Sequence, residues 1–339
     1  MKRIVKTAMA FVSASASAAI AQPIEPAAVV HIWTPDREIV RTFGQTGPDG
    51  TSTSPDHRFY LASTAKTLLA VSLLQAQEQD LLLLDDPAIE WLDDDIARIT
   101  SLSDDVTVRH LLEMRSGVHE YITDRYFDDW RNQRPATRTV RGSLTYVPRR
   151  QPAFEAGTEY QYINTNYLLA QLVLENAANT SMAHWFTENI FAPAGMKNSF
   201  VFGSQGGPSD IVTGWDDLDE DGTPEPVSEL YSGHGFGDGA VGAPARDLVA
   251  FYKALFVDRM LLGDGALKEL VADPQDDGYG LGIVITGQPG GPVYSHAGAF
   301  AGFVADAALN TANNAVVVAL IADGEGDTNE LINEVLNDL

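Results

Sequence analysis

Cysteine is absent from this chain of 339 residues. Disulfide bonds, lipid attachment through cysteine and a thiol nucleophile are therefore excluded, and packing must stabilise the fold. Lysine is scarce as well, with only six residues. No apolar run reaches the roughly 20 residues that a membrane-spanning helix requires, so we expect no membrane span.

Positive charge is also in short supply, and the formal net charge is −25 at pH 7. A surface of this kind repels nucleic acid and anionic lipid, so we expect neither as a partner. Hydrophobic residues still make up 45% of the chain, which is enough for a substantial core. We therefore expect a globular protein with one large domain or two lobes.

The first residues have the pattern of a secretory signal. Lys2, Arg3 and Lys6 precede a short apolar stretch, and Ala19-Ile20-Ala21 stands before Gln22. Small residues at such a position are typical of a cleavage site. The pattern predicts a signal peptide over 1–21 and an exported protein, periplasmic or secreted.

Strand patterns are concentrated at the two ends of the chain. A hairpin is predicted over 27–47, where two β-branched runs flank a Pro-Asp turn. Further strands are predicted over 280–285, 293–296, 302–309 and 315–322. An amphipathic helix over 328–339 is expected to close the chain.

Helical patterns dominate between these ends. A largely buried helix is predicted over 64–79, and helical segments over 108–114 and 167–176. The predicted fold class is therefore α/β plus all-α: an antiparallel sheet flanked by helices and built from both termini, with a helical lobe inserted in the middle.

Two lobes follow from this order of elements. We expect the mature chain, 22–339, to form an α/β lobe from about 22–80 and 231–339. The helical lobe would comprise about 81–230. A site is expected in the cleft between them, because clefts at lobe boundaries commonly hold sites.

Ser63 and Lys66 stand one helical turn apart at the start of the predicted buried helix, so they share a face. A serine hydroxyl is a poor nucleophile until a base accepts its proton, and lysine in apolar surroundings can act as that base. The spacing alone is weak, since 18 serines and six lysines give about 0.3 such pairs by chance. A lysine that reaches solvent from a core helix is the alternative.

Two further motifs accompany this pair. Tyr162 and Asn164 form a Tyr-x-Asn unit before a helix, where the phenol could transfer a proton and the amide could bind a substrate carbonyl. Asn164 could equally be a helix cap. His296-Ala297-Gly298 ends a predicted strand, and Gly298 would let a substrate backbone approach closely.

In this order and at these distances, the three motifs resemble those of the penicillin-recognising serine hydrolases. That family includes class C β-lactamases, D-alanyl-D-alanine carboxypeptidases, D-amino peptidases and related esterases. The similar stretches are 84–87, 106–121, 190–196, 237–255 and 279–283. The resemblance covers nearly the whole chain apart from the signal and implies a β-lactamase/transpeptidase-like fold.

The resemblance also implies roles. Ser63 would form an acyl-enzyme that water hydrolyses, with Lys66 and Tyr162 sharing the general-base and general-acid work. Which of the two takes the first proton stays open. The backbone N–H groups of Ser63 and Ala299 would form the oxyanion hole.

The rest of the site would bind substrate. By the same resemblance, Asn164 would hold the acyl side chain, and His296 and Gly298 would line the opposite wall with Ala299. The expected substrates are small peptides or esters, with peptidoglycan stem peptides and β-lactams among the candidates.

The third motif decides between members of the family. His-x-Gly looks more like that of D-alanyl-D-alanine carboxypeptidases and D-amino peptidases than the Lys-Thr-Gly of β-lactamases, so a peptidase acting near D-residues is favoured. Ala297 and Ala299 stand where the family places carboxylate-binding hydroxyls, which leaves His296 as the evident cation. A carboxylesterase, an amidase or a β-lactamase is therefore the alternative, and a non-catalytic peptide-binding protein a further one.

No cofactor is implied, and no metal by the catalytic motifs. The histidines outside the third motif, His31, His57, His110, His119, His184 and His234, lack metal-ligand spacing. Asp217, Asp219 and Asp221 match the start of a calcium loop, but Ser228 replaces the glutamate expected at the twelfth position. A solvated acidic turn is the favoured interpretation.

Overall fold

The computed structural model describes residues 25–231 and 236–337. The predicted signal peptide, 1–21, lies outside the described residues. The strands are β1 (Ala28–Trp33), β2 (Glu38–Phe43), β3 (Phe59–Tyr60), β4 (Phe200–Val201), β5 (Trp215–Asp216), β6 (Glu225–Pro226), β7 (Val241–Ala243), β8 (Val284–Gln288), β9 (Gly291–Phe300), β10 (Phe303–Asn310) and β11 (Ala315–Ile321).

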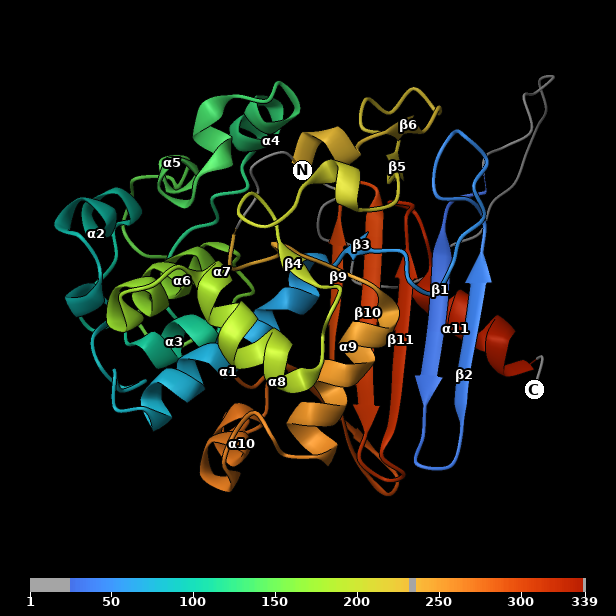
Figure 1. The fold of residues 1–339 in the computed structure, drawn as a ribbon. Helices are drawn as coiled ribbons and strands as arrows, with labels where there is room; N and C mark the ends of the chain where they lie inside the picture. The colour runs from blue at the N-terminus through green and yellow to red at the C-terminus, as the bar shows by residue number, and fades with distance from the viewer. Residues whose placement is uncertain (1–24, 232–235, 338–339) are drawn as a thin grey trace.

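Six of these strands form one antiparallel sheet in the order β2-β1-β11-β10-β9-β8 (Figure 1). Strand β1 pairs with the last strand, β11, so the two ends of the chain meet in the middle of the sheet. The prediction of an antiparallel sheet assembled from both termini is confirmed.

The helices are α1 (Ala65–Glu78), α2 (Asp94–Thr100), α3 (Val108–Leu112), α4 (Asp124–Arg131), α5 (Val140–Leu144), α6 (Thr165–Ala178), α7 (Met182–Trp185), α8 (Ala192–Ala194), α9 (Ala245–Tyr252), α10 (Asp264–Leu270) and α11 (Thr328–Asn337). The shorter 3₁₀ and π turns are η1 (Ala62–Thr64), η2 (Ala88–Trp91), η3 (Pro135–Arg138), η4 (Phe186–Phe191), η5 (Pro208–Asp210), η6 (Ser228–Tyr231) and η7 (Lys253–Val257). No described helix combines the length and apolarity that crossing a membrane requires.

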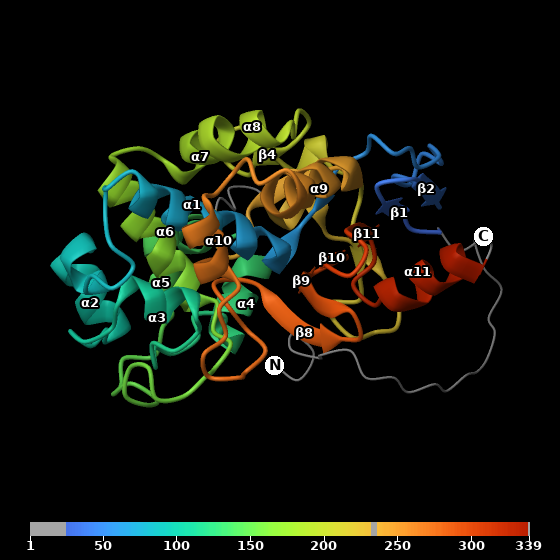
Figure 2. The ribbon, with the colours of Figure 1, turned by 90° about the horizontal axis from the view of Figure 1, so that it is seen from below.

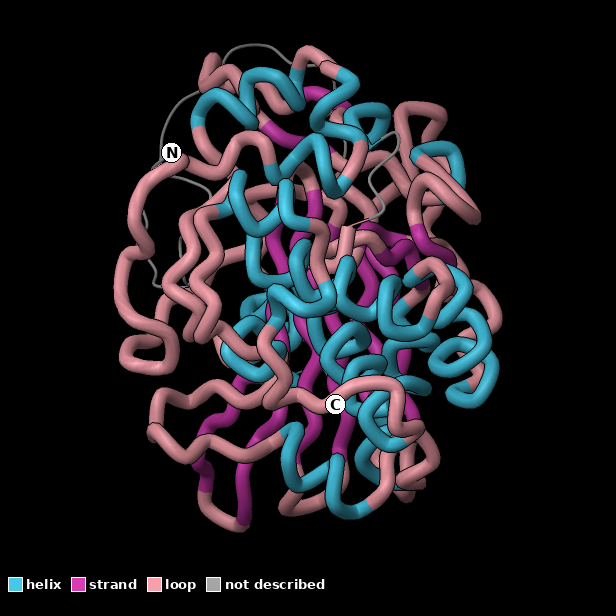
Figure 3. The backbone as a smooth tube through the Cα atoms, turned by 90° about the vertical axis from the view of Figure 1, so that its left-hand side faces the viewer, coloured by secondary structure: helices cyan, strands magenta, loops and turns pink. Residues whose placement is uncertain are grey.

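The sheet lies between two helical layers. Helix α9 packs on β11 and β1 from one side and α11 packs on β11 from the other (Figure 2). Helices α2 to α8 extend beyond the α1 side of the sheet, and a view from that side shows helices in front of the strands (Figure 3). Helix α1 is buried along nearly its whole length, as its apolar sequence predicts.

The strand predicted over 280–285 is wrong in its start, because β8 begins only at Val284. Gly278 and Gly282 adopt left-handed φ values of 76° and 65°, which a continuous strand does not allow. The carbonyl of Gly282 instead accepts a hydrogen bond of 2.7 Å from the Thr67 hydroxyl on α1. The apolar residues there are buried, but as a turn that packs on α1.

The short strands β3, β7 and β4 form a second sheet that the sequence did not predict. Strand β4 comes from the stretch assigned to the helical lobe, whereas β3 and β7 flank it in sequence. The lobe boundaries near 80 and 230 remain a prediction.

Candidate active site

Ser63 lies in the turn η1, between β3 and the buried helix α1. Its neighbour Ala62 has a φ of 47°, a left-handed conformation that costs an L-residue about 1–2 kcal/mol. The turn is held on both sides: Leu61 N donates to Val241 O at 2.9 Å, and the Thr64 hydroxyl donates to Leu61 O at 2.8 Å. The serine therefore sits on a fixed turn and remains partly exposed.

Lys66 is 0% exposed, so it does not reach solvent. Its Nζ lies 2.8 Å from Ser63 Oγ, 2.8 Å from Asn164 Oδ1 and 3.0 Å from the backbone oxygen of Asp238. These contacts take up the donor capacity of the amine without a partner carboxylate at ion-pair distance among the described side chains. The alternative of a lysine that reaches solvent from a core helix is wrong.

Asn164 stands at the N-cap position of α6, but its side chain makes no capping hydrogen bond. Its Nδ2 donates instead to Glu120 Oε2 at 3.0 Å. Because a carboxylate only accepts, this bond fixes the amide with Oδ1 toward Lys66. Asn164 is therefore a helix cap by position only, and its side chain belongs to the Lys66 environment.

Tyr162 places its ring beside the amine, with Lys66 Nζ 5.1 Å from the ring centroid. The ring of Tyr167 lies on α6 at 5.6 Å from the same nitrogen. Within residues 25–231 and 236–337, no hydrogen bond joins the Tyr162 hydroxyl to Ser63 or Lys66. The predicted phenol is thus adjacent to the pair and makes its contact through the ring face.

Strand β9 forms the opposite wall of the site. Gly298 packs so closely on η1 that an added Cβ would lie 2.6 Å from Leu61 O and 2.7 Å from Ser63 N. Only glycine permits this approach of the two backbones. The third motif and the nucleophile are therefore in direct contact.

Ala299 directs its N–H to the open edge of β9. Phe300 and Phe303 are paired across the two-residue turn between β9 and β10. Hydrogen-bonded and non-hydrogen-bonded pairs alternate in such a hairpin, so the next pair, Ala299 with Val304, is non-hydrogen-bonded. The N–H of Ala299 then points toward the edge that β8 covers only as far as Ser295.

His296 is buried and cannot serve as the cation that the sequence suggested. Its Nδ1 lies 2.7 Å from the Ala297 carbonyl, which only accepts, so Nδ1 carries a proton. Its Nε2 lies 3.3 Å from the Tyr279 hydroxyl. Burial first, and then the charge of Lys66, lower the pKa of His296 to about 3, so the imidazole is neutral at physiological pH.

Three residues near Lys66 were given no role from the sequence: Glu120, Tyr121 and Asp238. The Tyr121 hydroxyl donates to Asp238 Oδ2 at 2.8 Å, and Glu120 binds Asn164. Burial raises the pKa of Asp238, while the charge of Lys66 and then the Tyr121 bond lower it. Glu-Tyr and Gly-Asp-Gly carry no chemical motif, and only the fold brings them together.

The acidic turn has its three carboxylates together. Ligand atoms of Asp217, Asp219 and Asp221 lie within 4.8 Å of one another. Asp217 already accepts the N–H groups of Asp221 and Gly222 at 3.0 and 2.9 Å. Ser228 faces the protein, where its hydroxyl donates to Val212 O. Ser228, the residue at the twelfth position of a calcium loop, therefore does not offer the ligand that this position requires. The solvated acidic turn stays the favoured interpretation.

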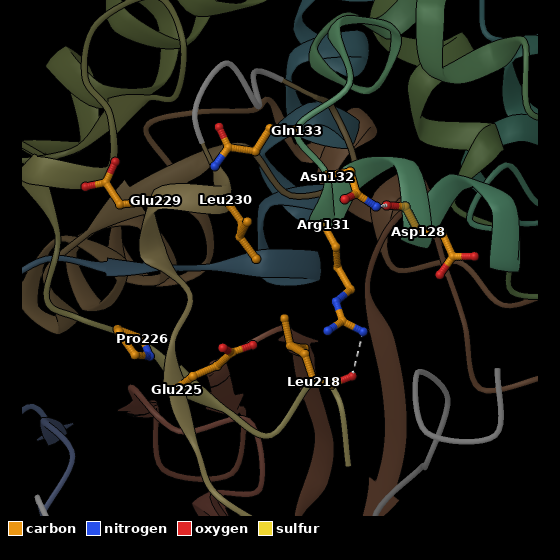
Figure 4. A pocket seen from close by; sticks show the side chains of 9 residues that line it. All are labelled: Asp128, Arg131, Asn132, Gln133, Leu218, Glu225, Pro226, Glu229 and Leu230. Atoms are coloured by element: carbon orange, nitrogen blue, oxygen red, sulfur yellow. Dashed lines mark hydrogen bonds between the residues drawn. The ribbon is translucent and has the colours of Figure 1, made fainter. Parts of the chain in front are cut away.

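A cavity of about 470 Å³ lies between the end of α4 and the segment 218–230 (Figure 4). Its lining residues are Asp128, Arg131, Asn132, Gln133, Leu218, Glu225, Pro226, Glu229 and Leu230. Arg131 projects into it and donates to the Leu218 carbonyl at 3.0 Å. No member of the Ser63 and Lys66 constellation lines this cavity, so it is separate from the candidate active site.

Comparison with known proteins agrees with the fold. Residues 12–337 match the model of the Beta-lactamase family, and the chain belongs to this family. It is similar to penicillin-binding protein 4* of Bacillus subtilis (strain 168), with 27% identity over 262 residues, 72% of this chain and 56% of that protein.

Two further proteins are similar to this chain over most of its length. A D-aminopeptidase of Gluconobacter oxydans (strain 621H) is 27% identical over 267 residues, 74% of this chain and 46% of that protein. The crystal structure of a D-stereospecific amidohydrolase from Streptomyces sp. superposes with a TM-score of 0.78 at 26% identity, over 91% of this chain and 93% of that chain. The chain spans about half the length of the curated relatives it matches.

Proposed function

We propose that this chain is a serine hydrolase that forms an acyl-enzyme on Ser63 and cleaves amides of D-amino acids bearing a free α-amino group. The observation that carries the proposal is the contact of 2.8 Å between Ser63 Oγ and the buried Lys66 Nζ. Two acceptors orient this amine, and β9 presents an open edge beside it.

Acylation begins at the Ser63 hydroxyl. A neutral lysine has two N–H donors and one lone pair, whereas the carbonyl oxygens of Asn164 and Asp238 can only accept. In the neutral form that acylation requires, Lys66 directs its two donors there and its lone pair at Ser63 Oγ, 2.8 Å away. Lys66 takes the hydroxyl proton as Oγ bonds to the substrate carbonyl carbon.

The remaining steps use the backbone and the phenol. The N–H groups of Ser63 and Ala299 receive the oxyanion of the tetrahedral intermediate. As the C–N bond breaks, the leaving amine takes the proton, from Lys66 directly or through the Tyr162 hydroxyl. Water then attacks the ester, and the acid leaves as Ser63 regains its proton.

The leaving-group side favours neutral groups. The third motif supplies no cation, because His296 is neutral at physiological pH and its neighbours Ala297 and Ala299 are aliphatic. A carboxylate placed there would be desolvated without a partner charge, which is costly. This disfavours a carboxypeptidase, which must hold a free C-terminal carboxylate.

The acyl side favours a positive group. Glu120 is partly exposed, and its carboxylate contacts Asn164, the residue assigned to the acyl side chain. An α-ammonium group bound beside Asn164 would lie in the field of this carboxylate. The names D-aminopeptidase and D-stereospecific amidohydrolase among the similar proteins agree with such a substrate.

A carboxylesterase is the second candidate, because the neutral wall at His296 suits an alcohol leaving group as well as an amine. A β-lactam could also acylate Ser63. Small amides and esters, including stem-peptide fragments, are therefore the substrate range to test.

Intact mass spectrometry tests the acyl-enzyme. Wild type and Ser63→Ala are exposed to D-alanine p-nitroanilide, an aryl ester and a penicillin. We expect an adduct or turnover in wild type and neither in Ser63→Ala. Turnover that survives the substitution would exclude Ser63 as the nucleophile.

The same spectra test export, which remains a proposal. Chain recovered from the periplasm or medium is expected to have the mass of a protein that begins at Gln22. Recovery of the full-length mass from the cytoplasm alone would remove the idea.

Substrate end groups test the specificity. Acetylating the α-amino group of the D-alanine anilide is expected to lower kcat/KM by about tenfold or more, since a charge-assisted contact is lost. Converting the C-terminal carboxylate of D-Ala-D-Ala to its amide is expected to leave kcat/KM equal or higher. A clear preference for the free carboxylate, measured under the same conditions, would restore the carboxypeptidase.

A further inference from the structure

Lys66 is aimed by two acceptors from distant parts of the chain. Asn164 begins α6, and Asp238 lies in the segment between η6 and β7. Their oxygens lie 2.8 and 3.0 Å from Lys66 Nζ. If either oxygen moved, the amine would gain freedom to turn away from Ser63. What holds these two oxygens therefore matters for the reaction.

The Asp238 carbonyl is held through its backbone and through its side chain. Asp238 stands between Gly237 and Gly239, whose N–H groups donate to Gln171 Oε1 at 2.8 Å and to Phe236 O at 3.1 Å. The Asp238 side chain is buried, at 8% exposed, and its Oδ2 accepts the bond of 2.8 Å from the Tyr121 hydroxyl. This bond anchors the residue whose carbonyl meets Lys66.

Asn164 is held from the same place. Glu120 Oε2 accepts the backbone N–H of Asn164 at 2.9 Å and its Nδ2 at 3.0 Å. The first bond places the residue, and the second sets the direction of its amide. A reversed amide would turn Nδ2 toward Lys66, where it could not accept.

Glu120 and Tyr121 are consecutive, in the loop between α3 and α4, and their backbone is itself fastened to α6. The N–H of Tyr121 donates to the Thr165 hydroxyl at 2.8 Å, and that hydroxyl donates to His119 O at 2.8 Å. From this held backbone the carboxylate reaches Asn164 and the phenol reaches Asp238.

We infer that the Glu120 carboxylate and the Tyr121 hydroxyl form a clamp that positions both acceptors of Lys66 and so directs its lone pair at Ser63. Glu120 and Tyr121 are positioning residues, because they act through Asn164 and Asp238. The inference rests on the proposed function, in which Lys66 is the base of acylation.

Tyr121→Phe tests the clamp, with Tyr126→Phe as its matched control. Both tyrosines are buried, and their rings touch edge to face at 4.8 Å. Of the two tyrosines, Tyr121 is the one that hydrogen-bonds the Asp238 side chain. Each substitution removes one buried hydroxyl and keeps the ring, so the two variants lose the same kind of packing contact.

For Tyr121→Phe we expect kcat on the preferred substrate to fall about tenfold with KM within about twofold. In the pH profile of kcat/KM, the acid limb should also move to higher pH. The Tyr121 bond lowers the pKa of Asp238, so its loss lets this carboxylate protonate at higher pH. Tyr126→Phe should leave kcat, KM and the acid limb as in wild type.

The charged and titratable groups that interact electrostatically with Asp238 come from four elements. They are Tyr60 on β3, Lys66 on α1, Tyr126 on α4, and Glu120 and Tyr121 in the α3 to α4 loop. The two tyrosine variants alter one of these groups each, so a shift confined to Tyr121→Phe is assigned to its bond with Asp238.

An unchanged kcat and acid limb in Tyr121→Phe would overturn the clamp, and so would an equal loss in both variants. A crystal structure of Tyr121→Phe gives a readout independent of catalysis: the contact between Lys66 Nζ and Asp238 O should lengthen or break. If wild type forms no acyl-enzyme with any probe, the proposed function fails. An unchanged contact between Lys66 Nζ and Asp238 O in the Tyr121→Phe structure refutes the clamp by itself.

Discussion

Replacing Lys66 by methionine is expected to lower kcat by about 10⁴-fold, the upper range for a positioned base that activates a nucleophile. Methionine fits the fully buried slot of the lysine side chain, so the fold should persist. Ser63 would then keep its place on η1 but lose the group that accepts its proton.

The same substitution should destabilise the protein in a pH-dependent way. The carbonyl oxygens of Asn164 and Asp238 lose a donor, at about 1–3 kcal/mol for each group left unsatisfied. Burial raises the pKa values of Glu120 and Asp238, and without the charge of Lys66 both rise further.

A carboxyl whose pKa is raised in the folded state binds more protons folded than unfolded, so its contribution to stability falls as pH rises through the folded pKa. The loss of unfolding free energy in Lys66→Met should therefore be larger at about pH 8 than at about pH 5. Denaturant unfolding at both pH values measures this difference.

Lys268→Met on α10 is the control, since Lys268 is exposed and remote from Ser63 in the fold. It should change neither kcat nor stability appreciably. Retention of more than a tenth of wild-type kcat in Lys66→Met would show that another group accepts the Ser63 proton.

Replacing Gly298 by alanine is expected to lower kcat/KM by about 10²-fold or more. The new Cβ would meet Leu61 O at 2.6 Å, Ser63 N at 2.7 Å and Thr64 N at 3.0 Å. All three are backbone atoms and cannot turn aside, so β9 and η1 must separate. A shift of about 1 Å between catalytic groups costs on the order of 10²-fold in rate.

Gly287→Ala in β8 is the matched control, because a Cβ there meets nothing within 4 Å. Gly298→Ala should also lower the free energy of unfolding by about 1–3 kcal/mol, as overpacking does. Steady-state kinetics and thermal melting of both variants test this. Equal activity in the two would mean that β9 and η1 need not touch for catalysis.

Local sequence determined much of this protein. Apolar periodicity placed α1 within one residue at each end, and Ser63 and Lys66 face one another because three residues make about one helical turn. The β-branched runs at both termini predicted the hairpin of β1 and β2 and the strands β9, β10 and β11. These features depend on neighbours in the chain, which is why pattern alone found them.

The acceptors of Lys66 could not be found in that way. Asn164 and Asp238 lie 98 and 172 positions from it, and the Glu120 and Tyr121 side chains that hold them have no motif. The neutral state of His296 likewise depends on burial and on the charge of Lys66. Hydrogen-bond direction and desolvation arise only when segments distant in sequence pack together, so the fold alone decided what surrounds the lysine that the sequence had identified.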